Sequence, residues 1–254
     1  MRISTRCYAV TGMGLVPPWC VNAGFVVGEH TTLIADTGAN AFAAATIHGY
    51  ATAARPGNQI TVINLEKHFD HIGGNSYFRS RGIDVFGHPG IERTEEEFRR
   101  EIDEFNAAIP DEARRARGEA SAFYEGTALA NPNRAISEEM VLELGDVNAQ
   151  VLHTPGHTPT NISVFVPGER VLFCGDCLVN GYLPNLKAGS VVDWWQWLGS
   201  LDRIAGLEPE VVVPGHGHVV RGAEVKPLIR RVRTVIEEAI SAQPRLASSS
   251  AQRA

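Results

Sequence analysis

The sequence lacks the features of membrane-spanning and disulfide-stapled proteins. Its 254 residues contain no apolar run that approaches the roughly 18 to 20 residues a membrane-spanning helix needs. Only four cysteines are present, too few for a disulfide scaffold in a chain of this length, so reduced thiols are expected. The first residues, MRISTRCYAV, hold no continuous apolar stretch. We therefore predict a soluble, cytoplasmic protein without a membrane partner.

Clustered positive charge is scarce as well. The 29 acidic and 23 basic side chains give a formal net charge of −6, and no dense stripe of Lys and Arg is available to neutralise phosphates. The densest basic cluster, Arg114, Arg115 and Arg117, has acidic neighbours and is interpreted as a solvated helix face. We expect a small-molecule substrate and no nucleic-acid partner.

The apolar residues, 44% of the chain, suffice for a large core. In the first half, strand-like runs alternate with helical patterns, which predicts a partly parallel sheet. In the second half, short strand-like runs follow one another, which is typical of antiparallel pairing. Two packed sheets flanked by helices are therefore expected. The predicted elements are a hairpin at 21–37, a helix at 40–54, strands at 59–65, 83–87, 140–144, 149–154, 161–166, 170–176 and from 210, and helices at 193–207 and 223–241.

Residues 90–135 differ in character, with many charges and few β-branched side chains. Thr94 and Glu97 fit a capping box, and Phe98 and Ile102 begin a series at helical spacing. We predict one domain over residues 1–242 with a helical insertion at about 90–135, followed by a disordered tail at 243–254. The insertion is also a candidate surface for homo-oligomer formation.

Histidine is the residue type that occurs in clusters in this sequence. Six of its nine histidines fall in three short segments. The first segment, EKHFDHIGG (66–74), directly follows a predicted strand. A strand end presents alternate residues on one side, so Glu66, His68 and Asp70 can converge, and His71 adds a nitrogen from the turn. Carboxylates and imidazoles at this density suit a divalent transition metal.

Three further strand ends carry ligand-type residues. HTPGHT (153–158) places His157 at a Pro-Gly turn, whereas His153 lies within the strand and is predicted to pack there. CGDC (174–177) ends a buried strand on Asp176, whose carboxylate is costly there unless it is paired or bound to a cation. VPGHGH (213–218) repeats the pattern with His216, and His218 is a neighbour. One ion cannot use seven ligands, so the residues suggest two metals sharing a carboxylate.

These segments resemble the metallo-β-lactamase superfamily. The matching motifs, in the family's order, are the hairpin end at Asp36, EKHFDHIGG (66–74), TPGHT (154–158), GD (175–176) and PGHG (214–217), over roughly residues 20–220. The resemblance implies an α/β fold, an αββα sandwich of two mixed β-sheets flanked by helices, with the metals at one edge. It further implies that one metal is bound by His68 and His157, that the other is bound by Asp70, His71 and His216, and that Asp176 bridges them.

Glu66 departs from the family's pattern, which begins with His. If Glu66 coordinates, the site has three carboxylates and is less positive than the family's site. A less positive site lowers the acidity of bound water and favours harder ions. We expect two divalent ions, zinc foremost, with Mn or Fe as alternatives because of Glu66.

Such a site suits a dinuclear metal-dependent hydrolase. A metal-bridging hydroxide would attack the carbonyl carbon of an ester, thioester, lactone or β-lactam. Asp70 would help to orient this nucleophile, and Asn185, in the segment YLPNL (182–186), is a candidate donor to the oxyanion. Two alternatives stay open. One is a persulfide dioxygenase-like oxidoreductase with a single iron on the same fold, and the other is a catalytically degenerate metal-binding protein.

The tryptophans divide into two groups. Trp194, Trp195 and Trp197 follow helical spacing, so core packing is predicted for them. Trp19 lies in the loop before the first hairpin, close to the metal edge in the family, and is a candidate for lining a substrate pocket. An apolar acyl substrate would then be favoured.

Overall fold

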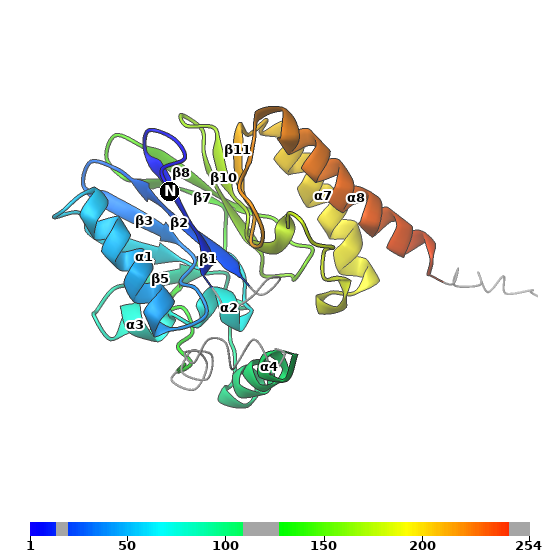
Figure 1. The fold of residues 1–254 in the computed structure, drawn as a ribbon, viewed down its shortest axis with the longest axis horizontal. Helices are drawn as coiled ribbons and strands as arrows, with labels where there is room; N and C mark the ends of the chain where they lie inside the picture. Colours follow the sequence, from blue (N-terminus) through cyan, green and yellow to red (C-terminus); the bar gives the residue numbers. More distant parts are fainter. Residues whose placement is uncertain (14–19, 109–126, 244–254) are drawn as a thin grey trace, which may run out of the picture.

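Two β-sheets pack face to face, with helices on their outer faces (Figure 1). The computed structural model describes residues 1–13, 20–108 and 127–243. Each sheet has six strands within these residues. The predicted αββα sandwich of two mixed sheets is confirmed.

The first sheet combines an antiparallel and a parallel part. Its strands, in spatial order, are β1 (Cys7–Met13), β2 (Val21–Val27), β3 (Thr31–Ala35), β4 (Gln59–Ile63), β5 (Val85–Gly87) and β6 (Arg134–Ala135). The predicted hairpin is the antiparallel pair of β2 and β3, and β3 to β6 pair in parallel. The helix α1 (Ala41–Ala54) follows β3, and the helix α3 (Asn75–Arg79) follows the ligand-rich segment after β4.

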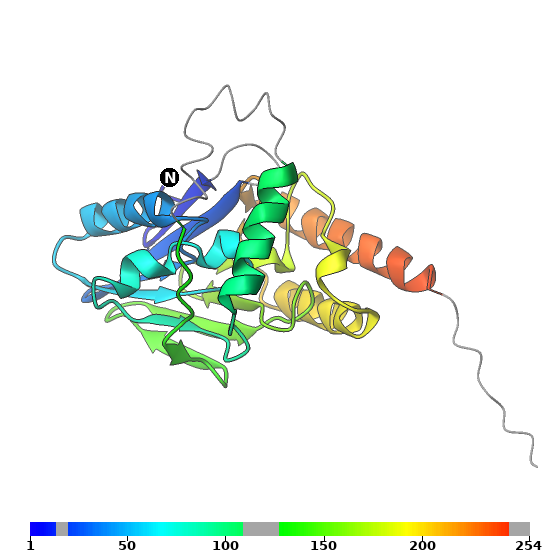
Figure 2. The ribbon, with the colours of Figure 1, turned by 90° about the horizontal axis from the view of Figure 1, so that it is seen from below.

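The second sheet has the spatial order β12 (Val220–Arg221), β11 (Val211–Val213), β10 (Val171–Phe173), β9 (Ile162–Val166), β8 (Asn148–His153) and β7 (Met140–Glu143). The pair of β10 and β11 is parallel, and the other pairs are antiparallel. The helices α7 (Val191–Gly206) and α8 (Val225–Ser241) pack side by side near this sheet (Figures 1 and 2). Short 3₁₀ helices are η1 (Gly175–Cys177), η2 (Leu186–Ala188) and η3 (Gly222–Glu224).

The main core lies between the two sheets. Leu33 and Ile63 of the first sheet and Val164 and Phe173 of the second belong to one cluster of buried apolar side chains. Central strands such as β2 and β9 are buried at every position, because one face meets the other sheet and the other face meets the helices. This double burial explains why these strands appear in the sequence as nearly continuous apolar runs.

The helix α4 (Glu95–Ala108) lies in the stretch predicted as a helical insertion. Its capping box is present, since the backbone N–H of Glu97 donates to Thr94 Oγ1 (3.2 Å) and that of Thr94 donates to Glu97 Oε2 (3.0 Å). Phe98 and Ile102 pack with Phe69 of the short helix α2 (Phe69–Ile72). The helix α4 thus lies beside α2 (Figure 2). The strand β6 lies in the same stretch but belongs to the first sheet. Arg114, Arg115, Arg117 and the predicted tail beyond Gln243 lie outside the described residues.

The tryptophans of α7 only partly follow the prediction of core packing. Trp197 is fully buried, and Trp194 is half-buried and donates its indole N–H to the Leu186 carbonyl (3.2 Å). Trp195 is 60% exposed, so the prediction is wrong there. Successive residues of a helix point about 100° apart, so three tryptophans within four positions cannot all face the core. Trp195 points to the side of α7 that does not pack inward. Trp19 lies outside the described residues.

Among the helices in the described part of the chain, none has the length and apolar character needed to cross a membrane.

Candidate metal centre

The candidate ligands meet at one edge of the sandwich because of the strand directions. The strands β8, β10 and β11 run in the same direction, so their carboxyl ends reach the same edge of the second sheet. Phe173 of β10 pairs with Val213 of β11, and Asp176 and His216 each follow three residues later. The loop after β4 brings ligands from the first sheet. The seven predicted ligands lie in the four connections that follow β4, β8, β10 and β11, two of which include the short helices α2 and η1: Glu66, His68, Asp70, His71, His157, Asp176 and His216.

Three of these residues form a first group, Glu66, His68 and His157. One ligand atom from each lies within 4.8 Å of the others. His68 Nδ1 is 2.5 Å from Glu66 Oε2 and 3.3 Å from His157 Nε2. The Glu66 carboxylate is fully buried, and it accepts hydrogen bonds from the His68 backbone N–H (2.6 Å) and from the Thr158 hydroxyl. Glu66 therefore lies where it could serve as a ligand of this group.

Asp70, His71 and His216 form a second group, with the same limit of 4.8 Å between their ligand atoms. His216 Nε2 is 3.3 Å from Asp70 Oδ2. The helix α2 carries Asp70 and His71, and the loop after β11 carries His216. The grouping agrees with the one that the family resemblance implied.

Asp176 lies between the two groups. Its Oδ1 is 3.3 Å from His71 Nε2 and 3.4 Å from His216 Nε2, and its Oδ2 is 3.3 Å from His157 Nε2. Each carboxylate oxygen therefore faces a different group. The role of Asp176 as a bridging ligand stays a prediction.

Two of the histidines are oriented through their second ring nitrogen. His71 Nδ1 is 2.8 Å from Asp36 Oδ2, and His216 Nδ1 is 3.0 Å from the carbonyl oxygen of Cys20. A carbonyl only accepts, so His216 Nδ1 carries the proton and Nε2 is left for the centre. Such outer partners fix the tautomer and the orientation of a metal-binding histidine.

Sequence reasoning placed Asp36 in the family pattern but gave it no role. Ala35 pairs with Ile63, so Asp36 lies beside the start of the ligand loop. Its φ is 64°, and its Oδ1 accepts a hydrogen bond from the Leu65 backbone N–H (2.7 Å). Asp and Asn are the non-glycine residues that most readily adopt this conformation. An aspartate directly at the end of a buried strand was the signal for a structural role.

Close backbone approach explains one glycine of the histidine motifs. A Cβ atom at Gly215 would lie 1.9 Å from Asp176 Oδ1 and 2.8 Å from the backbone carbon of Gly175. The glycine before His216 therefore lets the loop after β11 pass next to the bridging carboxylate.

Burial and charge act against each other in the centre. Burial by itself would lower the pKa of His216, but the Asp176 and Asp70 carboxylates outweigh burial and raise this pKa to about 10. Burial likewise opposes protonation of His68, and the neighbouring Glu66 carboxylate prevails and raises its pKa to about 9. In Glu66, burial favours the neutral acid, but the positive charge of His68 lowers the pKa below its ordinary value. The carboxylates are thus arranged to face positive charge.

The donor set fits metal ions. His71 Nε2 and Asp176 Oδ1 are buried without a hydrogen-bond partner among the described residues. Buried polar atoms in native proteins are normally satisfied by protein, water or an ion. His71 Nε2 and Asp176 Oδ1 face each other in the centre, where a cation would satisfy both. Imidazole nitrogens and carboxylate oxygens in two groups match the ligands of divalent transition metals.

The remaining predicted residues lie around this centre with other contacts. Asn185 is exposed, and its Oδ1 accepts a hydrogen bond from the Lys187 backbone N–H (3.1 Å), which caps η2. Its role as an oxyanion donor stays a prediction. His153 packs its ring against His88 (5.2 Å between centroids), as predicted, and His218 is exposed.

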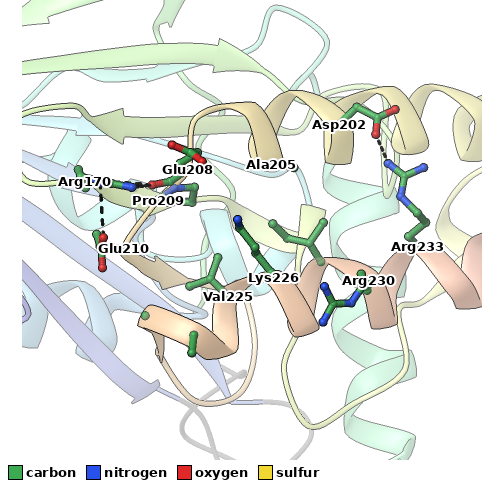
Figure 3. A pocket seen from close by; sticks show the side chains of 13 residues that line it. Arg170, Asp202, Ala205, Glu208, Pro209, Glu210, Val225, Lys226, Arg230 and Arg233 are labelled. Atoms are coloured by element: carbon green, nitrogen blue, oxygen red, sulfur yellow. Dashed lines mark hydrogen bonds and ion pairs between the residues drawn. The ribbon is translucent and has the colours of Figure 1, made fainter.

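A cavity of about 710 Å³ lies elsewhere, beside α7 and the start of α8 (Figure 3). Charged side chains in its lining pair with one another, Arg233 with Asp202 and Arg170 with Glu210. It contains none of the seven candidate ligands. The candidate site is therefore the edge of the sandwich, and not this cavity.

Comparisons with known proteins agree with the fold and the motifs. The sequence profile of the Metallo-beta-lactamase superfamily matches residues 16–216. The chain is 29% identical over 139 residues to a linear primary-alkylsulfatase of a Pseudomonas species, covering 52% of this chain and 26% of that protein. It is 27% identical over 153 residues to a hydroxyacylglutathione hydrolase of Rhodospirillum rubrum, covering 60% and 45%. The chain thus spans about a quarter to under half of these relatives.

A solved structure is similar over nearly its whole length. The metallo-beta-lactamase from Pontibacter korlensis superposes with a TM-score of 0.66 at 17% identity, covering 93% of this chain and 97% of that one. At this identity the likeness concerns the fold. Because the superfamily profile matches most of the chain, the protein belongs to the metallo-β-lactamase superfamily.

Proposed function

We propose that the protein is a hydrolase that binds two divalent metal ions and cleaves a carbonyl-containing bond of a small molecule. The observation that carries this proposal is the placement of Asp176, whose two oxygens face different ligand groups. A single ion would leave one group without a charge to bind. Zinc is the first expectation, with Mn or Fe as alternatives because Glu66 adds a carboxylate to the first group.

The residues have separate roles in this proposal. Glu66, His68 and His157 would hold one ion, Asp70, His71 and His216 would hold the other, and Asp176 would be shared between them. When bound, the ions would activate a water at neutral pH and polarise the carbonyl oxygen of the substrate. Asp70 would orient that water. Asp36 and the Cys20 carbonyl keep His71 and His216 in the tautomers that binding requires, and Thr158 holds one oxygen of Glu66.

The substrate class rests on the chemistry of the centre. Esters, thioesters, lactones and β-lactams all present a carbonyl carbon. The name of the Rhodospirillum relative supports an acyl substrate, and the name of the Pseudomonas relative adds sulfate esters to the compounds worth testing. The acidic excess of the chain argues against nucleic acid as a substrate.

Metal quantification followed by a substrate panel tests the proposal. The protein is purified without added metal, its ions are identified and counted, and esters, thioesters, lactones, β-lactams and sulfate esters are offered. Two divalent ions per chain with turnover of a carbonyl substrate support it. One iron per chain with oxygen uptake identifies the oxidoreductase alternative, and bound metal without turnover across the panel identifies a catalytically degenerate protein.

A cytoplasmic location and self-association through the helical insertion also belong to the proposal. The structure describes only part of that insertion, including α4, because residues 109–126 lie outside the described residues. Molar mass in solution and subcellular fractionation test these two expectations.

A further inference from the structure

The helix α4 brings a buried acidic side chain to the metal centre. Glu101 Oε1 is 3.8 Å from His68 Nε2, and the Glu101 side chain is only 13% exposed. Its other oxygen, Oε2, is 2.8 Å from Arg93 Nη2. None of the sequence motifs includes Glu101, which lies 33 residues after His68 in the chain.

Two of the other three candidate histidines, His71 and His216, show what this contact can do, whereas His157 Nδ1 has no hydrogen-bond partner among the described residues. His71 and His216 each turn one ring nitrogen toward the centre and the other toward an oxygen acceptor, Asp36 or the Cys20 carbonyl. In His68 the two ring nitrogens exchange these roles. Here Nδ1 faces the centre, where it lies next to Glu66 and His157. The nitrogen that needs an outer acceptor is therefore Nε2, and Glu101 is the carboxylate that faces it.

Arg93 fixes the direction of the Glu101 carboxylate. It is 12% exposed, and besides its contact with Glu101 Oε2 it donates to the carbonyl oxygen of Lys67 (3.0 Å). Lys67 lies between Glu66 and His68 in the ligand loop. Arg93 thus ties Glu101 and the ligand loop together, and it leaves Oε1 for His68.

The backbone that carries Glu101 is held by apolar packing. Phe98 and Ile102 are buried against Phe69 and Ile72 of α2, the helix that follows His68 directly. The rings of Phe69 and Phe105 also meet edge to face, with centroids 4.5 Å apart. The helix α4 therefore presents Glu101 from a fixed position, as a rigid element can and a loop cannot.

We propose that Glu101 is a positioning residue for the metal centre. It accepts a hydrogen bond from His68 Nε2–H and so keeps His68 Nδ1 as the ligand of the first group. The present distance of 3.8 Å is longer than the about 2.7–3.2 Å of a typical hydrogen bond, so the proposal requires the two side chains to approach by about 0.6–1.1 Å when the ion binds. The inference rests on the proposed function, and it gives the helical insertion a role in metal binding.

Metal affinity measured by chelator competition, with zinc and separately with cobalt, tests the proposal. The variants are Glu101→Ala and Glu101→Gln, and Glu104→Gln is the matched control, since Glu104 is an exposed residue of the same helix. The binding steps are assigned to the two groups with His157→Ala and His216→Ala. We expect Glu101→Ala to weaken the ion of the first group by about 10- to 100-fold, and the other ion to bind as in the parent.

The two other variants complete the expectation. Glu101→Gln keeps an oxygen acceptor without the charge and is expected to lose less affinity than Glu101→Ala. Glu104→Gln is expected to match the parent. Since cobalt absorbs visible light according to its ligand geometry, the spectrum of the first group changes in Glu101→Ala.

Three results would overturn the inference, and they can be told apart. Parent-like affinities in Glu101→Ala contradict it alone. Equal losses at both ions, with a lower unfolding midpoint of the metal-free protein, show that Glu101 merely holds α4 in place. A parent protein that binds no metal contradicts the proposed function together with this inference.

Discussion

At the scale of single residues, Glu66 distinguishes this chain from the pattern it otherwise follows. A carboxylate replaces the expected imidazole, and the structure surrounds it with donors, the His68 backbone N–H and the Thr158 hydroxyl. These contacts stabilise the ionised form in a fully buried position. The substitution is therefore accommodated by the fold, and it adds negative charge where a cation would bind.

The first prediction concerns Glu66→Gln, which keeps the shape of the side chain and removes its charge. We expect the ion of the first group to bind more than about 10-fold less tightly, because an ionised ligand becomes neutral. Metal content after dialysis and activity on the best substrate of the panel are the measurements. Glu143→Gln, on the exposed strand β7, is the control. Unchanged metal content and activity would show that Glu66 is not a ligand.

The second prediction concerns Asp36→Asn. Asparagine tolerates the φ of 64° and can still accept from the Leu65 N–H, so the backbone is expected to stay in place. The charged acceptor for His71 Nδ1 is lost, and we expect the ion of the second group to bind about 10- to 100-fold less tightly. Chelator competition measures this, with Asp103→Asn on α4 as an exposed control. Parent-like affinity would exclude an orienting role for Asp36.

At the scale of elements, backbone geometry decides where the ligands stand. Gly215→Ala is the third prediction. The added Cβ would collide with Asp176 Oδ1 and with the Gly175 backbone, so we expect a loss of about 1–3 kcal/mol in the free energy of unfolding. Binding of both ions should weaken, since Asp176 serves both groups. Denaturant unfolding and metal counting are the measurements.

Gly199→Ala is the matched control for Gly215→Ala. Gly199 lies inside α7 with nothing within 4 Å of an added Cβ, so alanine there should stabilise the helix by up to about 1 kcal/mol. Opposite signs for the two variants are expected. Equal effects would mean that the close approach at Gly215 has no energetic consequence.

The fourth prediction concerns the start of α7. Ser190 and Asp193 form a capping box, in which the Ser190 backbone N–H donates to Asp193 Oδ2 (2.7 Å) and Ser190 Oγ accepts from the Asp193 N–H (3.4 Å). We expect Ser190→Ala to lower the free energy of unfolding by about 1 kcal/mol. Ser241→Ala is the control, because Ser241 is the last residue of α8 and its exposed hydroxyl donates to the Glu237 carbonyl within that helix instead of capping a helix start, so its loss should have little effect. Denaturant unfolding distinguishes the two, and equal losses would contradict the capping role.

The element predictions succeeded where the pattern is long and local. The hairpin of β2 and β3, the helices α1, α7 and α8 and the capping box of α4 agree with the sequence. The strands β6 and β12, with two residues each, are too short for any periodicity to reveal. The strand β1 mixes polar and apolar residues at the edge of its sheet, and its pairing with β2 rather than its own sequence defines it.

At the scale of the whole molecule, a histidine pair joins the two sheets. His88 follows β5 of the first sheet, and His153 ends β8 of the second, with their ring centroids 5.2 Å apart. His88 Nδ1 accepts a hydrogen bond from the Gly90 N–H (3.0 Å), which requires the neutral ring. Burial first, and the neighbouring His153 second, lower the pKa of His88 below its ordinary value of 6.5.

The fifth prediction follows from this shift. The folded state binds a proton at His88 less readily than the unfolded state, so its stability contribution is complete above about pH 6.5 and falls as the pH decreases. In the metal-free protein, His68 and His216 have raised pKa values and act in the opposite direction, so His88 is isolated by comparing the parent with a variant. We expect the free energy of unfolding of the parent, relative to that of His88→Asn, which keeps an acceptor for Gly90, to be lower at pH 5.5 than at pH 7.5. Denaturant unfolding at both pH values measures it, with His30→Asn on an exposed turn as the control.

The sequence by itself determined the candidate ligands and their local spacing. Glu66, His68, Asp70 and His71 fall within six residues, and His157, Asp176 and His216 each come within four residues after the end of a strand, so short-range geometry is enough to mark them as candidates. The sandwich followed from the alternation of strand-like and helical runs, because apolar periodicity is a local property of the chain.

Only the tertiary structure decided how these residues act together. Asp36 meets His71 through the register of β3 and β4, and Glu101 reaches His68 because α4 packs on α2. The same holds for Trp195, which the fold leaves at the surface. Contacts between residues far apart in the chain depend on which faces pack together. That choice is made by the whole core, and no single segment of the sequence contains it.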